Sequence, residues 1–234
     1  VRSSAASDVY KRQVQDDGEA LRQSLFHSGT HFNPDLLTSE AERRARLEGV
    51  HAALDRAESL VFLDTESTGG RNGRLIEVAL VETDVEQNVT GGLHFRCNPH
   101  RRSLAGARRV HGIQDCELEH CPEFAARADE LLEAVRGKTV VIHDRTMDLL
   151  WLNRELQAAR PGAPRFEDRC TVVDSFVLAR AIPSERRRNG LDALLEWYGL
   201  GARGGHHDAY GDAALLSRVF FELWWDLDEW LYGE

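Results

Sequence analysis

The sequence predicts an α/β fold with a mixed central sheet flanked by helices. Three strand candidates follow one another between residues 60 and 97, and helices and strands then alternate from residue 122 onward. Short connections between consecutive strands favour antiparallel pairing, whereas a helical crossover favours parallel pairing. We therefore expect one sheet of three antiparallel strands followed by two parallel strands.

The chain before the first strand is expected to lie outside the main domain. Residues 1–13 are expected to be a non-native leader. A possible coding sequence for Asp8–Gln13 resembles the transposon end that is used to fragment DNA for sequencing libraries. Residues 14–58 read as a polar N-terminal arm that ends in a lead-in helix, with Ser39 as its candidate N-cap. The folded domain is then expected over residues 59–231.

The first half of the domain contains apolar runs of strand length. They are Leu60–Glu66, Leu75–Thr83 and Gly92–Cys97. The connection between the first two contains Asn72-Gly73, a pair suited to a tight turn. An antiparallel start to the sheet follows from this order.

The second half of the domain alternates helical and strand patterns. Helices are expected at Pro122–Val135, Asp148–Ala159, Ser175–Ala181, Leu191–Tyr198 and Asp208–Leu231, and strands at Thr139–His143 and Asp168–Val173. Gly199 is placed as a C-terminal stop for the fourth of these helices. Each of the two strands therefore enters the sheet after a helix.

Length and charge exclude several classes of protein. A chain of 234 residues can bury one sizeable core, and no run approaches the roughly 20 apolar residues of a membrane span. A formal net charge of −10 argues against a protein that coats nucleic acid through a broad basic surface. The sequence contains no recognisable signal peptide, so we expect a soluble, cytoplasmic protein without a membrane partner.

Acidic residues stand where strands and helices meet. Asp64 and Glu66 end the first strand, and the two-residue period of a strand points both carboxylates to one side. Asp148 opens a helix directly after another strand, and Asp212 follows His207 by five positions near the start of the last helix. Oxygen ligands of this kind select hard divalent ions, Mg²⁺ or Mn²⁺, rather than Zn²⁺.

The sequence around these residues resembles that of the DEDDh 3'-to-5' exonucleases. Within that family it is most similar to the proofreading epsilon subunits of bacterial DNA polymerase III. The resemblance runs from about Ser59 to about Phe221 and is carried by Phe62–Gly69, Val110–Ile113, Val141–Asp148 and His207–Ala213. Each motif alone is weak, and their common order makes them specific together. The resemblance implies a ribonuclease H-like fold and removal of nucleotides from DNA 3' ends.

The resemblance also implies roles for individual residues. Asp64, Glu66, Asp148 and Asp212 would hold two Mg²⁺ or Mn²⁺ ions, and His207 would be the general base. The residues implied in contacts with the 3'-terminal nucleotide are Thr65, Thr68, Gly69, His111 and Met147. The family usually has Asn and Phe at positions 144 and 147, where this chain has Asp144 and Met147, which affects handling of the terminal base rather than metal binding.

Several alternatives stay open from sequence alone. The substrate is expected to be a single-stranded DNA 3' end, with RNA or oligoribonucleotide ends as the second hypothesis and a catalytically silent scaffold that binds nucleic acid as the third. The protein could act with the DNA polymerase III catalytic subunit or by itself. Arg186-Arg187-Arg188 could contact the phosphate backbone or form a solvated loop.

Overall fold

The computed structural model describes residues 39–233 and contains one five-stranded sheet. Its strands are β1 Ser59–Ser67, β2 Leu75–Asp84, β3 Val89–Arg96, β4 Thr139–Ile142 and β5 Thr171–Asp174. Their order across the sheet is β3-β2-β1-β4-β5, with antiparallel β1/β2 and β2/β3 pairs and parallel β1/β4 and β4/β5 pairs. The predicted fold class and strand pairing are confirmed.

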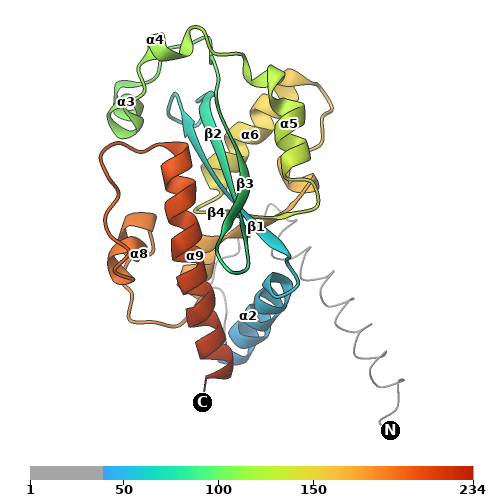
Figure 1. Cartoon of the computed structure of the whole chain (residues 1–234), viewed down its shortest axis with the longest axis vertical. Helices are drawn as coiled ribbons and strands as arrows, with labels where there is room; N and C mark the ends of the chain where they lie inside the picture. The colour runs from blue at the N-terminus through green and yellow to red at the C-terminus, as the bar shows by residue number, and fades with distance from the viewer. Residues whose placement is uncertain (1–38, 234) are drawn as a thin grey trace.

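Helices cover both faces of this sheet (Figure 1). They are α2 Glu40–Leu54, α3 Ala105–His111, α4 Asp115–Leu118, α5 Ala128–Ala134, α6 Thr146–Ala159, α7 Ser175–Ala181, α8 Leu191–Trp197 and α9 Ala209–Tyr232, with short 3-10 helices at η3 Phe124–Ala126 and η4 Phe166–Asp168. The helix expected at Pro122–Val135 is divided into η3 and α5, and the start of the strand expected at Asp168–Val173 belongs to η4. The helix α3, which has seven residues and contains Gly106, was not predicted from the sequence.

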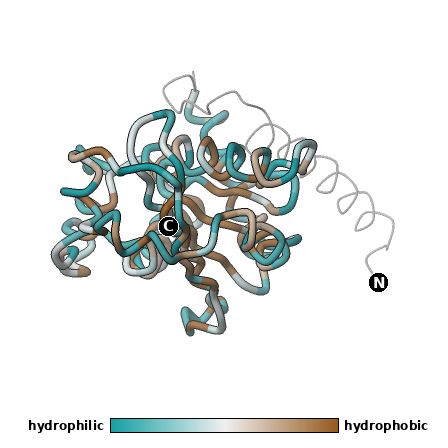
Figure 2. Tube along the Cα trace, turned by 90° about the horizontal axis from the view of Figure 1, so that it is seen from above, coloured by the Kyte–Doolittle hydropathy of each residue, from teal (hydrophilic) through white to brown (hydrophobic). Residues whose placement is uncertain are grey.

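The alternation of β1 divides the core into two layers. Leu60 and Phe62 pack with the buried residues of α2, α7, α8 and α9 on one face. Val61 and Leu63 pack with α5 and α6 on the other. The hydrophobic segments accordingly gather in the middle of the molecule (Figure 2). β1 lies at the centre of the sheet, so the residues at its end are reached by helices from both faces.

The lead-in helix is confirmed as α2. The Ser39 hydroxyl accepts a hydrogen bond from the Glu42 backbone N–H at 3.2 Å, as expected of an N-cap, and Leu47, Val50 and Leu54 are buried. The expected leader and most of the polar arm, residues 1–38, lie outside the described residues. Among residues 39–233, no helix has the length and apolar character needed to cross a membrane.

Candidate active site

The end of β1 presents side chains to both faces of the sheet. Asp64 and Glu66 alternate with Thr65, so they share the face of Phe62 and point toward the α9 layer, as the strand period predicts. Thr65 points toward the α6 layer, where its hydroxyl donates a hydrogen bond of 2.6 Å to Oδ1 of Asp148. The strand therefore supplies two carboxylates directly and orients a third.

Asp148 lies in the first turn of α6, which begins at Thr146, two residues earlier than expected. The turn before this helix is held by Asp174, whose carboxylate accepts hydrogen bonds from the backbone N–H groups of Asp144 at 3.2 Å and Arg145 at 3.3 Å. Asp144 adopts a positive φ of 57°, which Asp and Asn tolerate better than other side chains. This junction brings the buried Asp148 carboxylate next to β1.

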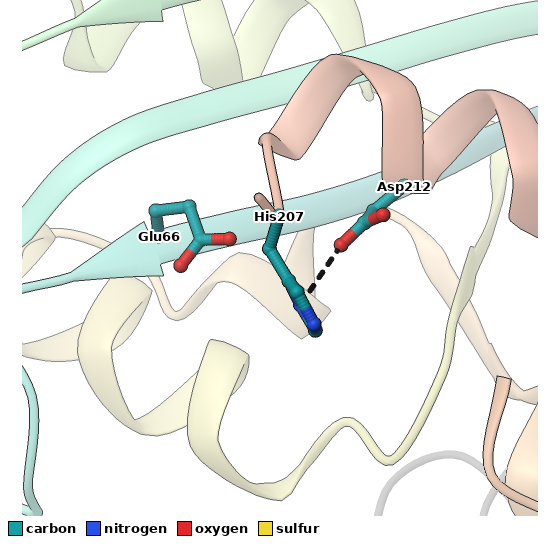
Figure 3. Close-up of side chains that lie close together, drawn as sticks. All are labelled: Glu66, His207 and Asp212. Atoms are coloured by element: carbon teal, nitrogen blue, oxygen red, sulfur yellow. Dashed lines mark ion pairs between the residues drawn. The ribbon is translucent and has the colours of Figure 1, made fainter. Parts of the chain in front are cut away.

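The first turn of α9 completes the cluster. Asp208 caps the helix by accepting a hydrogen bond from the Gly211 N–H at 2.7 Å, and Asp212 points inward from the same turn. Ligand atoms of Glu66, His207 and Asp212 all lie within 4.8 Å of one another (Figure 3). Nδ1 of His207 is 3.3 Å from Oδ2 of Asp212, and the imidazole side chain is 38% exposed. His207 thus lies at the rim and the carboxylates lie inside.

The carboxylates share one electrostatic environment. Burial raises their pKa values, to about 8 for Glu66, about 7 for Asp148 and about 6 for Asp212. Burial also raises the pKa of Asp64 well above its usual range, with further contributions from the charges of Asp148, Glu66 and Asp212. The four groups predicted as metal ligands therefore lie close enough to repel one another. Such a cluster is stabilised by a cation.

Arg203 supplies one positive charge to this cluster, and sequence reasoning missed it. Its Nη1 donates to the Asp212 carboxylate and to Nδ1 of His207, while its Nε donates to Asp192 at 3.0 Å. The guanidinium lowers the pKa of Asp212 and, together with burial, the pKa of His207. The one available signal was an arginine among the glycines of residues 199–205, four positions before His207 and nine before Asp212.

A cavity of about 660 Å³ adjoins Arg203 and His207 on the side of α8. Its wall includes Asp192 and Glu196 as well as Gly201 and Gly205 of the loop that carries Arg203. The cavity separates this loop from α8 beside the carboxylate cluster. Arg203 contributes to the lining of this cavity, although its side chain is only 12% exposed.

Three of the residues predicted to contact substrate lie at the end of β1 or directly after it: Thr65 is within the strand, and Thr68 and Gly69 follow it. The Thr65 hydroxyl is engaged by Asp148, and Thr68 is fully buried with its Oγ1 accepting a hydrogen bond from the Arg74 N–H at 3.0 Å. Gly69 has a φ of 92°, and a Cβ there would lie 2.9 Å from Cβ of Ala107. The glycine therefore permits close packing of α3 on this segment.

His111 and Met147 approach the cluster from α3 and α6. Nδ1 of the buried His111 accepts a hydrogen bond from the Ile113 N–H at 3.0 Å, and its Nε2 has no hydrogen-bond partner among residues 39–233. Met147 is partly exposed, one position before Asp148. The loop carrying His207 docks on the same segment, because the His207 N–H donates to the Val110 carbonyl at 3.0 Å. This backbone hydrogen bond therefore holds the predicted base His207 next to the segment that carries His111.

The arginine run at 186–188 is not the exposed surface that its sequence suggests. The side chain of Arg186 is only 1% exposed and binds the Asp226 carboxylate, the Tyr198 hydroxyl and, at 3.2 Å, the Ala179 carbonyl. Arg188 pairs with Glu196 at 3.3 Å on the surface. The expectation of a phosphate contact or solvated loop is therefore wrong for Arg186, which joins α7, α8 and α9.

The end of the central strand, the clustered carboxylates and the histidine at their rim define an α/β enzyme with an acidic active site of the kind that a cation stabilises. A sequence profile of the exonuclease family (RNase_T) matches residues 61–220, which contain every element of this site. The chain belongs to the exonuclease family.

The curated relatives include DNA polymerase III subunit epsilon of Rickettsia felis, which is 34% identical over 168 residues that cover 70% of this chain and 72% of the relative. The epsilon subunit of Escherichia coli K12 is 33% identical over 172 residues, covering 70% of each chain. The resemblance to epsilon subunits is therefore confirmed.

Solved structures support the fold independently. E. coli Exonuclease I in complex with a dA16 oligonucleotide has a TM-score of 0.52 and 21% sequence identity over 74% of this chain. This chain spans 41% of that Exonuclease I chain. The likeness is to the exonuclease domain fold, the ribonuclease H-like arrangement expected from the sequence.

Proposed function

We propose that the protein is a divalent-metal-dependent 3'-to-5' exonuclease that hydrolyses phosphodiester bonds at DNA 3' ends and releases nucleoside monophosphates in proofreading or repair. The proposal is supported by the group of Glu66, His207 and Asp212, whose ligand atoms lie within 4.8 Å of one another, and by the effect of the Asp148, Glu66 and Asp212 charges on the pKa of Asp64. Family membership and the epsilon relatives support the same reaction.

The donor set fits two Mg²⁺ or Mn²⁺ ions. Asp64, Glu66 and Asp212 would hold one ion, and Asp64 with Asp148 would hold the other. Carboxylate oxygens are the ligands that these ions prefer, and the raised pKa values show a surplus of buried negative charge. Bound ions would supply Lewis-acid stabilisation of charge at the scissile phosphate.

The remaining chemistry belongs to side chains at the rim. Burial and Arg203 lower the pKa of His207, so the imidazole is neutral at physiological pH. Its lone pair on Nδ1 accepts the hydrogen bond from Arg203, so Arg203 would have to release Nδ1 before the imidazole takes a proton from the attacking water. Contacts to the terminal nucleotide are assigned to the segment of Thr65, Thr68 and Gly69, through backbone where the side chain is buried, and to His111 and Met147. These contacts would hold the 3' end in line with the attacking water.

The substrate proposed is a single-stranded DNA 3' end, because E. coli Exonuclease I, which has the same fold, has been solved in complex with dA13 and dA16 oligonucleotides. The protein partner proposed is the DNA polymerase III catalytic subunit, by analogy with the name of the epsilon relatives. Co-purification with that subunit supports this partner, and exonuclease activity without stable association supports free-standing action.

Matched single-stranded DNA and RNA oligonucleotides labelled at the 5' end test the activity. With Mn²⁺, the protein should convert labelled DNA into a ladder of progressively shorter products, and shorten RNA more slowly. Asp212→Asn should lower the rate by at least about 10³-fold, because a metal ligand contributes several kcal/mol to the transition state. Asp129→Asn, which alters an 83% exposed carboxylate on α5, is the matched control and should leave the rate unchanged.

The label also separates the competing functions. Immediate release of a labelled mononucleotide would show the opposite polarity and overturn the proposal. Faster shortening of RNA would transfer the assignment to RNA 3' ends. Binding of either strand without shortening would leave the scaffold hypothesis.

A further inference from the structure

Glu77 is a buried carboxylate directly behind the predicted metal ligand Glu66. It lies on β2 in register with Glu66 on β1, and it is 1% exposed. Directly opposed residues of an antiparallel pair point to the same face, so Glu77 shares the α9 face with Glu66. Its negative charge contributes to the raised pKa of both Glu66 and Asp212. Like charges in such a position destabilise a sheet unless other groups compensate for them.

Three donors compensate for the Glu77 charge. Oε1 accepts hydrogen bonds from Nε of Arg96 at 2.8 Å and Nε2 of His94 at 3.0 Å, both on β3. Oε2 accepts a hydrogen bond from the Ala209 backbone N–H at 3.1 Å. These bonds lower the pKa of Glu77 despite its burial, so the group is ionised at neutral pH. Two donors belong to the neighbouring strand, and the third belongs to a helix 132 positions away in the chain.

The third donor is the first residue of α9. Ala209 is completely buried, two positions after His207 and three before Asp212. Its N–H is one of the helix-terminal groups that have no partner inside the helix. On the other side of this turn, the His207 N–H is held by the Val110 carbonyl at 3.0 Å. The segment from His207 to Asp212 is therefore held at two backbone N–H groups, and Glu77 joins it to the sheet at one of them. The Tyr210 ring also contacts the His94 ring of β3.

We propose that Glu77 is a positioning residue for the active site. Its carboxylate holds the first turn of α9 against the end of β1 and thereby sets the spacing between Glu66, on the sheet, and the His207 and Asp212 pair, on the helix. Glu77 contacts neither substrate nor ion in this role. The inference rests on the proposed function, because the spacing matters only if these residues act together.

A second buried carboxylate in the chain offers a matched control. Glu155 on α6 is 3% exposed and accepts hydrogen bonds from Nε of Arg74 at 2.5 Å and from the Leu75 N–H at 3.2 Å. It therefore joins a helix to β2 through the same kinds of contact as Glu77. Its helix is α6 rather than α9. A general cost of disturbing a buried carboxylate should appear equally in both.

Glu77→Gln and Glu155→Gln are compared in Mn²⁺ titrations followed by electron paramagnetic resonance, without DNA. Glu77→Gln should weaken Mn²⁺ binding about 10- to 100-fold, as loss of an outer-shell partner does. Its kcat should fall while the KM for DNA stays within about twofold, and extra Mn²⁺ should restore part of kcat. Glu155→Gln should lower the thermal midpoint but leave Mn²⁺ affinity within about twofold.

Amide hydrogen exchange separates positioning from loss of charge. Peptides that span residues 206–213 should exchange faster in Glu77→Gln and at the wild-type rate in Glu155→Gln. In the first variant, one amide oxygen replaces the two carboxylate oxygens that accept from Arg96, His94 and the Ala209 N–H, so the bond to Ala209 is weakened. If Glu77→Gln fails to fold, Arg96→Gln is the substitute. Arg96 is partly exposed and supports Glu77 from β3, so its loss should change Mn²⁺ affinity in the same direction by a smaller factor.

Two results would overturn the proposal: wild-type Mn²⁺ affinity in Glu77→Gln, or unchanged exchange at residues 206–213. Failure of the proposed function looks different, because wild-type protein would then bind Mn²⁺ without shortening DNA. The affinity and exchange measurements report on Glu77 in either case.

Discussion

Two clusters of charge include residues of α9, Asp226 in one and Asp212 in the other, and they are built differently. The cluster of Arg186, Tyr198 and Asp226 contains one acid, one guanidinium and one hydroxyl, and each group is bonded to the other two. The active site contains four predicted metal-binding carboxylates and one guanidinium, and burial raises the pKa of every one of these acids. The paired charges of Arg186 and Asp226 hold α7, α8 and α9 together. The excess of carboxylates at the active site lowers the stability of the fold but favours binding of cations.

The largest expected effect concerns the matched cluster. Asp226→Ala leaves the Arg186 guanidinium buried without its carboxylate, which should lower the free energy of unfolding by about 3 kcal/mol. Urea denaturation measures this loss. Glu196→Ala, which breaks the exposed pair with Arg188, is the control and should change the free energy by less than about 1 kcal/mol. Equal losses in the two variants would remove the distinction between the clusters.

The unmatched cluster should make stability depend on pH in the opposite sense to an ordinary ion pair. The folded pKa of Glu66, about 8, lies above its ordinary value of 4.5, so the folded protein binds this proton more tightly. The contribution is fully present below about pH 4.5 and is lost as the pH rises through about 8. In EDTA, the thermal midpoint of wild type relative to Glu66→Gln should therefore fall across this range. A constant difference between the two proteins would contradict the assigned pKa.

Addition of Mn²⁺ supplies the control for this pH dependence. Because the ion neutralises the ionised carboxylates, it should raise the wild-type midpoint more at pH 8 than at pH 5. Glu66→Gln should show a smaller rise at pH 8, since it lacks one of the predicted ligands.

A smaller effect is expected from the single positive charge in the cluster. The Arg203 guanidinium and a divalent ion compete for the Asp212 carboxylate, so Arg203→Gln should tighten Mn²⁺ binding several-fold at pH 9, where the acids are ionised. Calorimetric titration measures the change. Arg188→Gln, a substitution in an exposed pair, should leave the affinity unaltered. Weaker binding in Arg203→Gln would show that the guanidinium supports the site rather than competing for it.

Local sequence patterns predicted the part of the site that one strand carries. The two-residue period places Asp64 and Glu66 on one face, and β1 confirms it. Asp148 was also singled out by its place at a strand-to-helix junction, but a lone acid at a helix start is most often a cap. Its assignment as a ligand, like the roles of His207 and Asp212, came from family resemblance. Their convergence depends on the tertiary contacts of α6 and α9, which no local pattern encodes.

Glu77 and Arg203 show why the rest was missed. Glu77 stands within the apolar run of β2, and its one signal was a charged residue in a strand buried on both sides. Arg203 lies in a glycine-rich loop whose path is set by neighbouring segments rather than by its own residues. The helix α3 was missed for a related reason, because Gly106 weakens its local preference and packing of Ala107 against Gly69 fixes it.

The last helix has a further consequence for how far the working unit extends. α9 has 24 residues and a length of about 36 Å, with Asp212 in its first turn. At its opposite end Asp228 bonds to His51 of α2 at 2.9 Å, and Arg44 donates to the Leu231 carbonyl. All four residues of these two contacts lie outside residues 61–220, which match the family. The domain that matches the family is therefore packed against α2 and the end of α9, two segments that lie outside the family match.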